Sequence, residues 1–158
     1  MMMEVLSEIV SHPEFPEGEA WVRHPLKANE VIVSEGEEGG SLFFIETGEL
    51  RVTGRVELEE ERRVQPGICD LAAGDVFGEL SLFGNRTRTA NVAAITDAVV
   101  VELDGEKLGR FLDRHPDLGY RLLKELFETL AGRLSRTNRQ MENLFAWGLR
   151  AHGIPKYL

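Results

Sequence analysis

The chain has 158 residues, a formal net charge of −9 and a single cysteine, and each of these numbers excludes a class of protein. The length suits one domain with a buried core and is short for two. The negative charge argues against nucleic acid as a partner, because phosphate backbones are bound by clustered Lys and Arg. The lone Cys69 leaves no internal disulfide, and no apolar run reaches the length of a membrane span or of a signal peptide. We therefore expect a cytoplasmic protein without membrane association.

The first hundred residues are typical of a protein built from short β-strands. Val, Ile, Phe and Thr cluster in runs of about five residues between Gly, Pro and Asn. Glycines at 35–40 and 46–49 fit hairpin turns, and the charged stretch 57–63 fits an exposed hairpin end. Such closely spaced strands predict an antiparallel sandwich or barrel. The expected strands are NEVIVSEG, SLFFIETG, ELRVTGRVEL, RRVQ, GICDL, TANVAAI and DAVVVEL.

After residue 104 the hydrophobic period changes from two to about 3.5, which predicts helices. EKLGRFLDRH reads as a short helix, and Pro116 can open a long one at its first turn. In the long helix, apolar positions alternate in steps of three and four, as in a coiled-coil seam. We expect this seam to pair two copies of the chain; the alternative is a helix that lies wholly on its own domain. The seam positions are Tyr120, Leu123, Phe127, Leu130, Leu134, Thr137, Met141 and Leu144.

The stretch FGELSLFGNRTRTANV (77–92) places an acid and a base inside a small and apolar run. A Gly74–Asp75 turn that leads into a short helix would present free backbone N–H groups to an anion. Arg88 can add a charge-assisted contact to phosphate, and Glu79 can accept from hydroxyl groups such as those of a ribose. The residues alone leave open whether Glu79 and Arg88 serve a nucleotide or simply pair with each other.

This stretch resembles the phosphate-binding cassette of cyclic nucleotide-binding domains, such as those of cAMP-dependent protein kinase regulatory subunits. The matching pattern is F-G-E-L, a small residue, Leu, and then R-T-A-x-V without a gap. The upstream stretch PLKANEVIVSEGEEGGSLFFIETGELRV is similar to the opening of the same family. The stretch from HPDLGYRLL to RLSRTNRQMENLF resembles the long helix of bacterial cAMP receptor transcription factors. The resemblance covers roughly residues 25 to 146 and implies an antiparallel β-roll (a jelly-roll, or double-stranded β-helix), mainly β, followed by a short and a long C-terminal helix.

The resemblance also implies ligand-binding residues. Glu79 would contact the ribose 2′-OH, Arg88 would pair with the cyclic phosphate, and Gly48 would be structural. Thr89 does not choose between adenine and guanine, whereas the polar residues at 137 and 138 fall where relatives contact the adenine edge. This favours cAMP over cGMP as the ligand. The expected ligand-binding residues are Gly78, Glu79, Leu80, Ser81, Arg88, Thr89, Ala90, Thr137 and Asn138.

The expected organisation is a leader (1–14), a β-roll core (15–104), a hinge with the long helix (105–146) and a tail (147–158). The transcription factors continue into a helix-turn-helix, whereas only a short stretch follows Leu144 here, so we expect no such domain in this sequence; the alternative is that the sequence is a piece of a larger protein. We expect a stand-alone, non-enzymatic sensor that binds cAMP or cGMP, needs no cofactor, and acts as a homodimer on an unknown downstream protein. The alternative is a structural or dimerisation module with an empty site. A metal-dependent barrel enzyme is disfavoured, because His12, His24, His115 and His152 are scattered along the sequence and predict no metal site.

Overall fold

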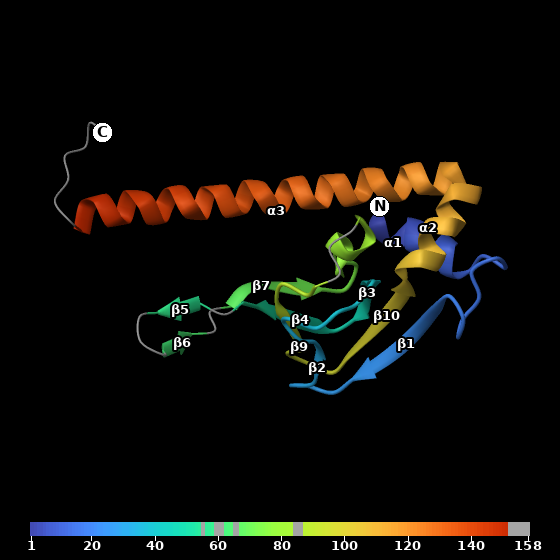
Figure 1. The fold of residues 1–158 in the computed structure, drawn as a ribbon, viewed down its shortest axis with the longest axis horizontal. Helices are drawn as coiled ribbons and strands as arrows, with labels where there is room; N and C mark the ends of the chain where they lie inside the picture. The colour runs from blue at the N-terminus through green and yellow to red at the C-terminus, as the bar shows by residue number, and fades with distance from the viewer. Residues whose placement is uncertain (55, 59–61, 65–66, 84–86, 152–158) are drawn as a thin grey trace. The chain divides into compact units, whose positions relative to one another are not determined.

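The computed structural model describes residues 1–54, 56–58, 62–64, 67–83 and 87–151, and the chain divides into two compact units, Met1–Leu122 and Leu123–Leu158. The first unit is an antiparallel β-roll of two four-stranded sheets, ordered β1-β10-β3-β8 and β2-β9-β4-β7 (Figure 1). A separate ladder joins β5 to β6. The strands are β1 (Trp21–Leu26), β2 (Val31–Val33), β3 (Ser41–Thr47), β4 (Glu49–Thr53), β5 (Val56–Leu58), β6 (Arg62–Val64), β7 (Gly67–Ala72), β8 (Val76–Phe77), β9 (Asn91–Ala94) and β10 (Ala98–Asp104).

Helices precede and follow the roll, so the predicted fold, mainly β with a short and a long C-terminal helix, is confirmed. The short helix is α2 (Gly105–Arg114) and the long helix is α3 (Pro116–Ala151), which opens at Pro116 as predicted. Helix α3 continues past the residue 146 that we expected as its end. The predicted hairpin end at 57–63 falls partly outside the described residues, although β5 and β6 pair as a hairpin would.

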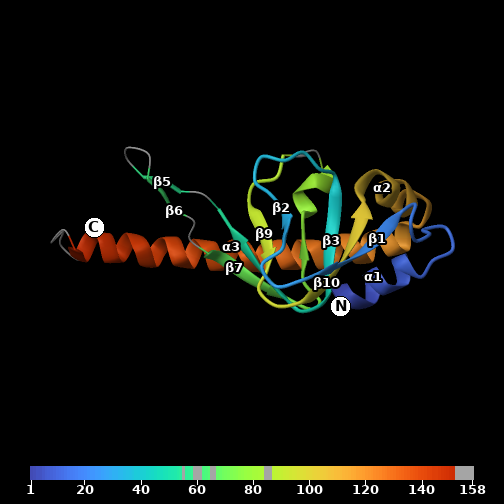
Figure 2. The ribbon, with the colours of Figure 1, turned by 90° about the horizontal axis from the view of Figure 1, so that it is seen from below.

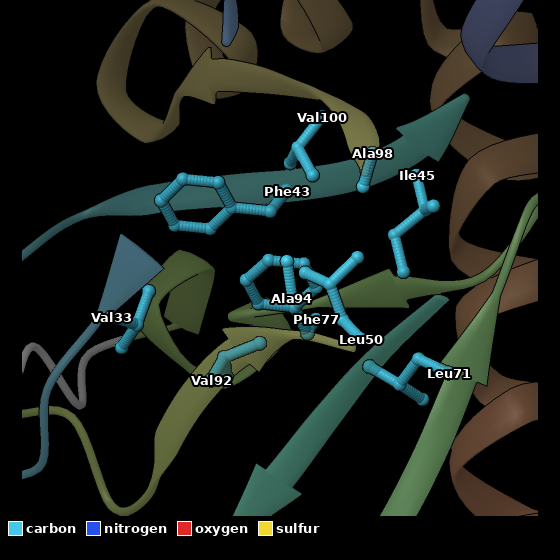
Figure 3. Close-up of a cluster of buried hydrophobic side chains, with 10 residues drawn as sticks. All are labelled: Val33, Phe43, Ile45, Leu50, Leu71, Phe77, Val92, Ala94, Ala98 and Val100. Atoms are coloured by element: carbon cyan, nitrogen blue, oxygen red, sulfur yellow. The ribbon is translucent and has the colours of Figure 1, made fainter. Parts of the chain in front are cut away.

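The two sheets enclose one hydrophobic core, in which side chains from both sheets point toward one another (Figure 3). Alternate residues of β3 and β10, such as Phe43, Ile45 and Val100, face the core because successive side chains of a strand point to opposite faces. The rings of Phe43 and Phe77 stack 4.8 Å apart. The core cluster is Val33, Phe43, Ile45, Leu50, Leu71, Phe77, Val92, Ala94, Ala98 and Val100.

The segment 1–14, which we expected to be a leader, contains the helix α1 (Met2–Val10). Its buried positions follow helical spacing, and Leu6 and Ile9 are fully buried. At the start of α3, Arg121 forms a bidentate ion pair with Glu8 of α1, both contacts at 2.8 Å. Helices α1 and α2 lie at the same end of the roll (Figure 2). The N-terminal segment is therefore an integral part of the compact unit.

The described part of the second unit is the remainder of α3, and the predicted seam is exposed along it. Phe127 is 74% exposed, Leu134 61% and Leu144 69%. Large apolar side chains at this exposure are unusual on a helix surface without a partner. Among the helices that the structure describes, none is long and apolar enough to cross a membrane.

Candidate functional site

Two glycines with a left-handed backbone lie at the start of the cassette, one just before the stretch 77–92 and one within it. Gly74 (φ +94°) closes the turn between β7 and β8, and Gly78 (φ +79°) separates β8 from the next element. That element is a short 3₁₀ helix, η1 (Glu79–Phe83), where we expected one helical turn. Glu79 is its first residue and is buried, with 9% of its surface exposed. The sequence thus folds locally into a glycine turn that places a buried carboxylate at a helix start.

Arg88 is buried on the other side of this turn, with 8% of its surface exposed. Its backbone is fixed by the loop that follows β2, because Arg88 N–H donates to Glu37 O and Gly36 N–H donates to Arg88 O, both over 2.8 Å. Its guanidinium donates from Nη2 to Ser41 O over 3.2 Å and lies 5.3 Å from the centre of the Phe43 ring. The side chain is therefore held in a defined orientation over the first residues of β3.

Two glycines make room for the guanidinium. A Cβ atom at Gly78 would lie 2.8 Å from Arg88 Nη1 and 2.7 Å from Ser41 O. A Cβ atom at Gly39 would lie 3.0 Å from Arg88 Nη2. Real Cβ atoms essentially never lie this close to another heavy atom. A side chain at Gly78 would therefore force both the Ser41 carbonyl and the Arg88 guanidinium to move. The glycine turn and the arginine are thus one packed unit.

The charge of Arg88 is balanced by carboxylates. Burial lowers the pKa of the guanidinium because desolvation disfavours its charged form, while Glu102, Glu37 and Glu79 act in the opposite direction. An arginine keeps its proton at neutral pH, so the site holds a permanent buried cation. An anionic ligand here would gain a strong partner, at the cost of approaching nearby carboxylates.

Arg88 lines a pocket of about 380 Å³ formed by residues of β1, β2, β3, β10 and the loop between β2 and β3. Gly78 and Glu79 are not among the lining residues, so the pocket opens along one side of the arginine and the cassette turn flanks another. The lining combines apolar side chains, such as Ile32 and Phe43, with several polar ones. The polar lining residues are His24, Glu37, Glu38, Ser41, Arg88 and Glu102.

Three pocket residues that sequence reasoning missed are linked by hydrogen bonds. Glu102 Oε1 lies 2.7 Å from His24 Nε2, and Ser41 Oγ donates to Glu102 Oε2 over 2.6 Å. The strand register explains the contact, because Val22 pairs with Glu102 and His24 with Val100, which makes His24 a diagonal neighbour of Glu102 on one face. No local motif signals this network, since it joins three separate strands.

The structure brings together some of the predicted site residues and not others. Gly78, Glu79 and Arg88 converge. Leu80 is 52% exposed and Thr89 is exposed, whereas Ala90 is half-buried; the side chain of Ser81 lies outside the described residues. Thr137 and Asn138 belong to the second unit, where both are exposed and the Thr137 hydroxyl donates to Arg133 O over 3.0 Å. The ligand contacts of the whole set remain predictions.

A β-roll that buries Arg88 beside a glycine turn and the carboxylate of Glu79 has the features of a binding domain for a small anionic ligand. Residues 23–115 match the family model described as the cyclic nucleotide-binding domain. The chain belongs to the cyclic nucleotide-binding domain family.

Curated relatives carry this domain within longer proteins. The chain is 40% identical over 82 residues to the cGMP-dependent protein kinase egl-4 of Caenorhabditis elegans, covering 51% of this chain and 10% of the kinase. It is 30% identical over 114 residues to a CRP-like cAMP-activated global transcriptional regulator of Mycobacterium tuberculosis, covering 72% of this chain and 47% of the regulator. The chain thus spans about half of the regulator and a tenth of the kinase.

Solved structures support the fold. The Thermus thermophilus catabolite activator protein superimposes with a TM-score of 0.67 at 23% identity, over 89% of this chain and 59% of that one. A cyclic nucleotide-binding domain from Methylobacillus flagellatus gives a TM-score of 0.70 at 22% identity, over 79% of this chain and 68% of that one. At these identities the comparison concerns the fold alone.

Proposed function

We propose that this chain is a non-enzymatic cyclic nucleotide receptor that binds cAMP in preference to cGMP and signals through its C-terminal helix. The observation that carries the proposal is the buried Arg88 guanidinium, packed against the Gly78 turn with Glu79 nearby. A permanent cation with an acceptor beside it suits a ligand that combines one phosphate charge with ribose hydroxyl donors.

In this proposal each site residue has one role. The cyclic phosphate pairs with Arg88 and with backbone N–H groups at the start of η1, contributed by Gly78, Leu80 and Ser81. Glu79 accepts from the ribose 2′-OH, while Thr89 and Ala90 adjoin the phosphate. Thr137 and Asn138 of the long helix contact the base edge, which is the basis for the preference for adenine. The phosphate takes the place of Ser41 O as the partner of Arg88.

We propose that ligand binding is transmitted to the C-terminal helices through contacts inside the first unit. The first residue of α2, Gly105, donates its N–H to Gly40 O over 2.8 Å, next to Gly39, which packs against Arg88. A Cβ atom at Gly105 would lie 3.5 Å from Leu82 Cδ2 of η1, so α2 starts against the cassette. A ligand that reorganises η1 and the 39–40 loop would therefore shift the hinge that we propose between residues 104 and 117, which contains α2, and with it the long helix.

Partners and location complete the proposal. The exposed seam of α3 suits a homodimer, which would act on a downstream protein, and we expect this to happen in the cytoplasm without nucleic acid as a partner. The second candidate is a dimerisation module with an empty site. It is favoured by one observation: Glu37, Glu38 and Glu102 surround the pocket and oppose an anion.

A thermal-shift panel separates the two candidates. The receptor predicts that cAMP raises the melting temperature, that cGMP does so less at equal concentration, and that 5′-AMP has little effect. A melting temperature that none of the three changes, up to millimolar concentration, supports the empty module and rejects the receptor.

A further inference from the structure

The fold brings three metal-ligating side chains from distant parts of the sequence together at one end of the first unit. His12 and Glu14 follow α1, and His115 is the residue between α2 and α3. One donor atom from each of the three lies within 4.8 Å of the other two. The sequence alone predicts no metal site here, because position 115 is about a hundred residues away along the chain.

The two imidazoles are held by the surrounding structure. Their centroids lie 4.6 Å apart, and both rings pack on the fully buried Phe111, at 5.0 Å for His12 and 4.5 Å for His115. Their backbones are anchored, since His12 N–H donates to Ile9 O and His115 N–H to Phe111 O. Preorganised ligands lower the cost of metal binding, because little freedom remains to be lost.

We propose that His12, Glu14 and His115 form a binding site for a divalent transition-metal ion, and specifically for Zn²⁺. Two imidazoles and a carboxylate are a borderline donor set that suits zinc better than Mg²⁺ or Ca²⁺, which prefer oxygen ligands. The exposed side of Glu14 leaves a fourth position for water. None of these three residues lines the Arg88 pocket.

Metal binding exchanges existing contacts for coordinate bonds. Glu14 Oε2 now contacts His115 Nε2, and the ion would sit between these two atoms. Glu14 N–H donates to His12 Nδ1 over 3.1 Å, so a metal that binds this nitrogen has to displace that hydrogen bond. Zinc ligands lie about 2.0–2.2 Å from the ion, so Glu14 Oε2 and His115 Nε2 must move apart to admit it, and the exposed Glu14 side chain can supply most of this movement. The ion would then link the N-terminal segment to the α2–α3 junction.

Isothermal titration with ZnCl₂ tests the site on a chain without a polyhistidine tag and with the exposed thiol removed by Cys69→Ser. We expect one zinc ion per chain. Glu14→Gln and His115→Gln should each weaken zinc binding at least about tenfold. Glu17→Gln, which removes a nearby exposed carboxylate, should leave it unchanged.

Circular dichroism checks that each variant is folded. If His115→Gln does not fold, the exposed Glu14→Gln tests the same prediction on its own. The proposal is overturned by the absence of saturable zinc binding, or by an affinity that Glu14→Gln leaves equal to that of the parent chain.

Discussion

Arg88 donates a hydrogen bond from its guanidinium to the carbonyl oxygen of Ser41, over 3.2 Å. Ser41 in turn donates its hydroxyl to Glu102. The Arg88 cation of the proposed phosphate site is thus hydrogen-bonded to the start of β3 and linked through Ser41 to the pocket carboxylate Glu102. A phosphate that pairs with Arg88 has to compete with this arrangement, so residues that hold or repel it should change the affinity for the ligand.

Gly78→Ala should damage both stability and ligand binding. The left-handed backbone alone costs a non-glycine residue about 1–2 kcal/mol. The new Cβ would also meet Ser41 O at 2.7 Å and Arg88 Nη1 at 2.8 Å. Gly18→Ala is the matched control, because Gly18 has φ +86° and open space around a Cβ. Urea denaturation should show a larger loss for Gly78→Ala than for Gly18→Ala, and only Gly78→Ala should weaken cAMP binding. Equal losses in both variants would show that the contact with Arg88 is unimportant.

Glu79→Ala should remove the dependence of binding on the ribose 2′-OH, because alanine has no side-chain acceptor. The buried carboxylate is the proposed acceptor for this hydroxyl, and a hydrogen bond to a charged group contributes about 1.5–3 kcal/mol. The parent chain should therefore bind 2′-deoxy-cAMP about tenfold or more weakly than cAMP. Glu79→Ala should bind the two ligands with similar affinity. A variant that still discriminates as strongly as the parent would assign the 2′-OH to another residue.

Glu102→Gln should tighten the binding of an anionic ligand. Glu102 lines the pocket and is one of the carboxylates that act on Arg88, so it repels a phosphate that approaches the arginine. Removing its charge should gain about 1 kcal/mol, or roughly fivefold in affinity. Glu46→Gln is the control, since it removes a carboxylate that pairs with Arg23. If calorimetry finds weaker binding for Glu102→Gln, the carboxylate is needed as a ligand acceptor or to hold Ser41.

Leu134→Glu should abolish self-association. Leu134 lies in the middle of the exposed seam of α3, and a charge at such a position would be buried in a paired helix. Arg136→Glu, also exposed on α3 but outside the seam, is the matched control. Sedimentation should show a dimer for the parent and for Arg136→Glu, and a monomer for Leu134→Glu. A monomeric parent chain would remove the basis for a homodimer.

Much of the fold followed from local patterns in the sequence. Runs of β-branched residues predicted most strands, and Gly48 and Gly74 occupy the left-handed positions that their turns require. Three elements were missed: β1, helix α1 and the two-residue strand β8, whose residues we expected to lead into a short helix. A proline argues against a strand, so Pro25 hid β1 from the sequence pattern. The sheet tolerates Pro25 because β1 is an edge strand. Helix α1 is short and has no side-chain cap, so only the spacing of its apolar residues indicates it.

The candidate site also contains residues that a local motif identifies and residues that only the folded sheet brings together. Gly78, Glu79 and Arg88 lie close together in sequence, so a motif alone can identify them. The hydrogen-bonded link from His24 through Glu102 to Ser41 depends on the register of β1, β10 and β3. β1 and β10 are far apart in the sequence, so no hairpin turn sets the register between them. The pairing of His12 with His115 is non-local in the same sense.

Isothermal titration of cAMP into the parent chain, Arg88→Ala and Arg51→Ala tests the central claim most directly. Arg51 is an exposed arginine that pairs with Asp70, so its removal controls for the loss of one positive charge. We predict saturable binding by the parent and Arg51→Ala. We predict a loss of about 2–5 kcal/mol of binding free energy for Arg88→Ala, because the phosphate would lose its charged partner. An affinity that Arg88→Ala leaves unchanged, or a parent chain that binds neither cAMP nor cGMP, would contradict the account.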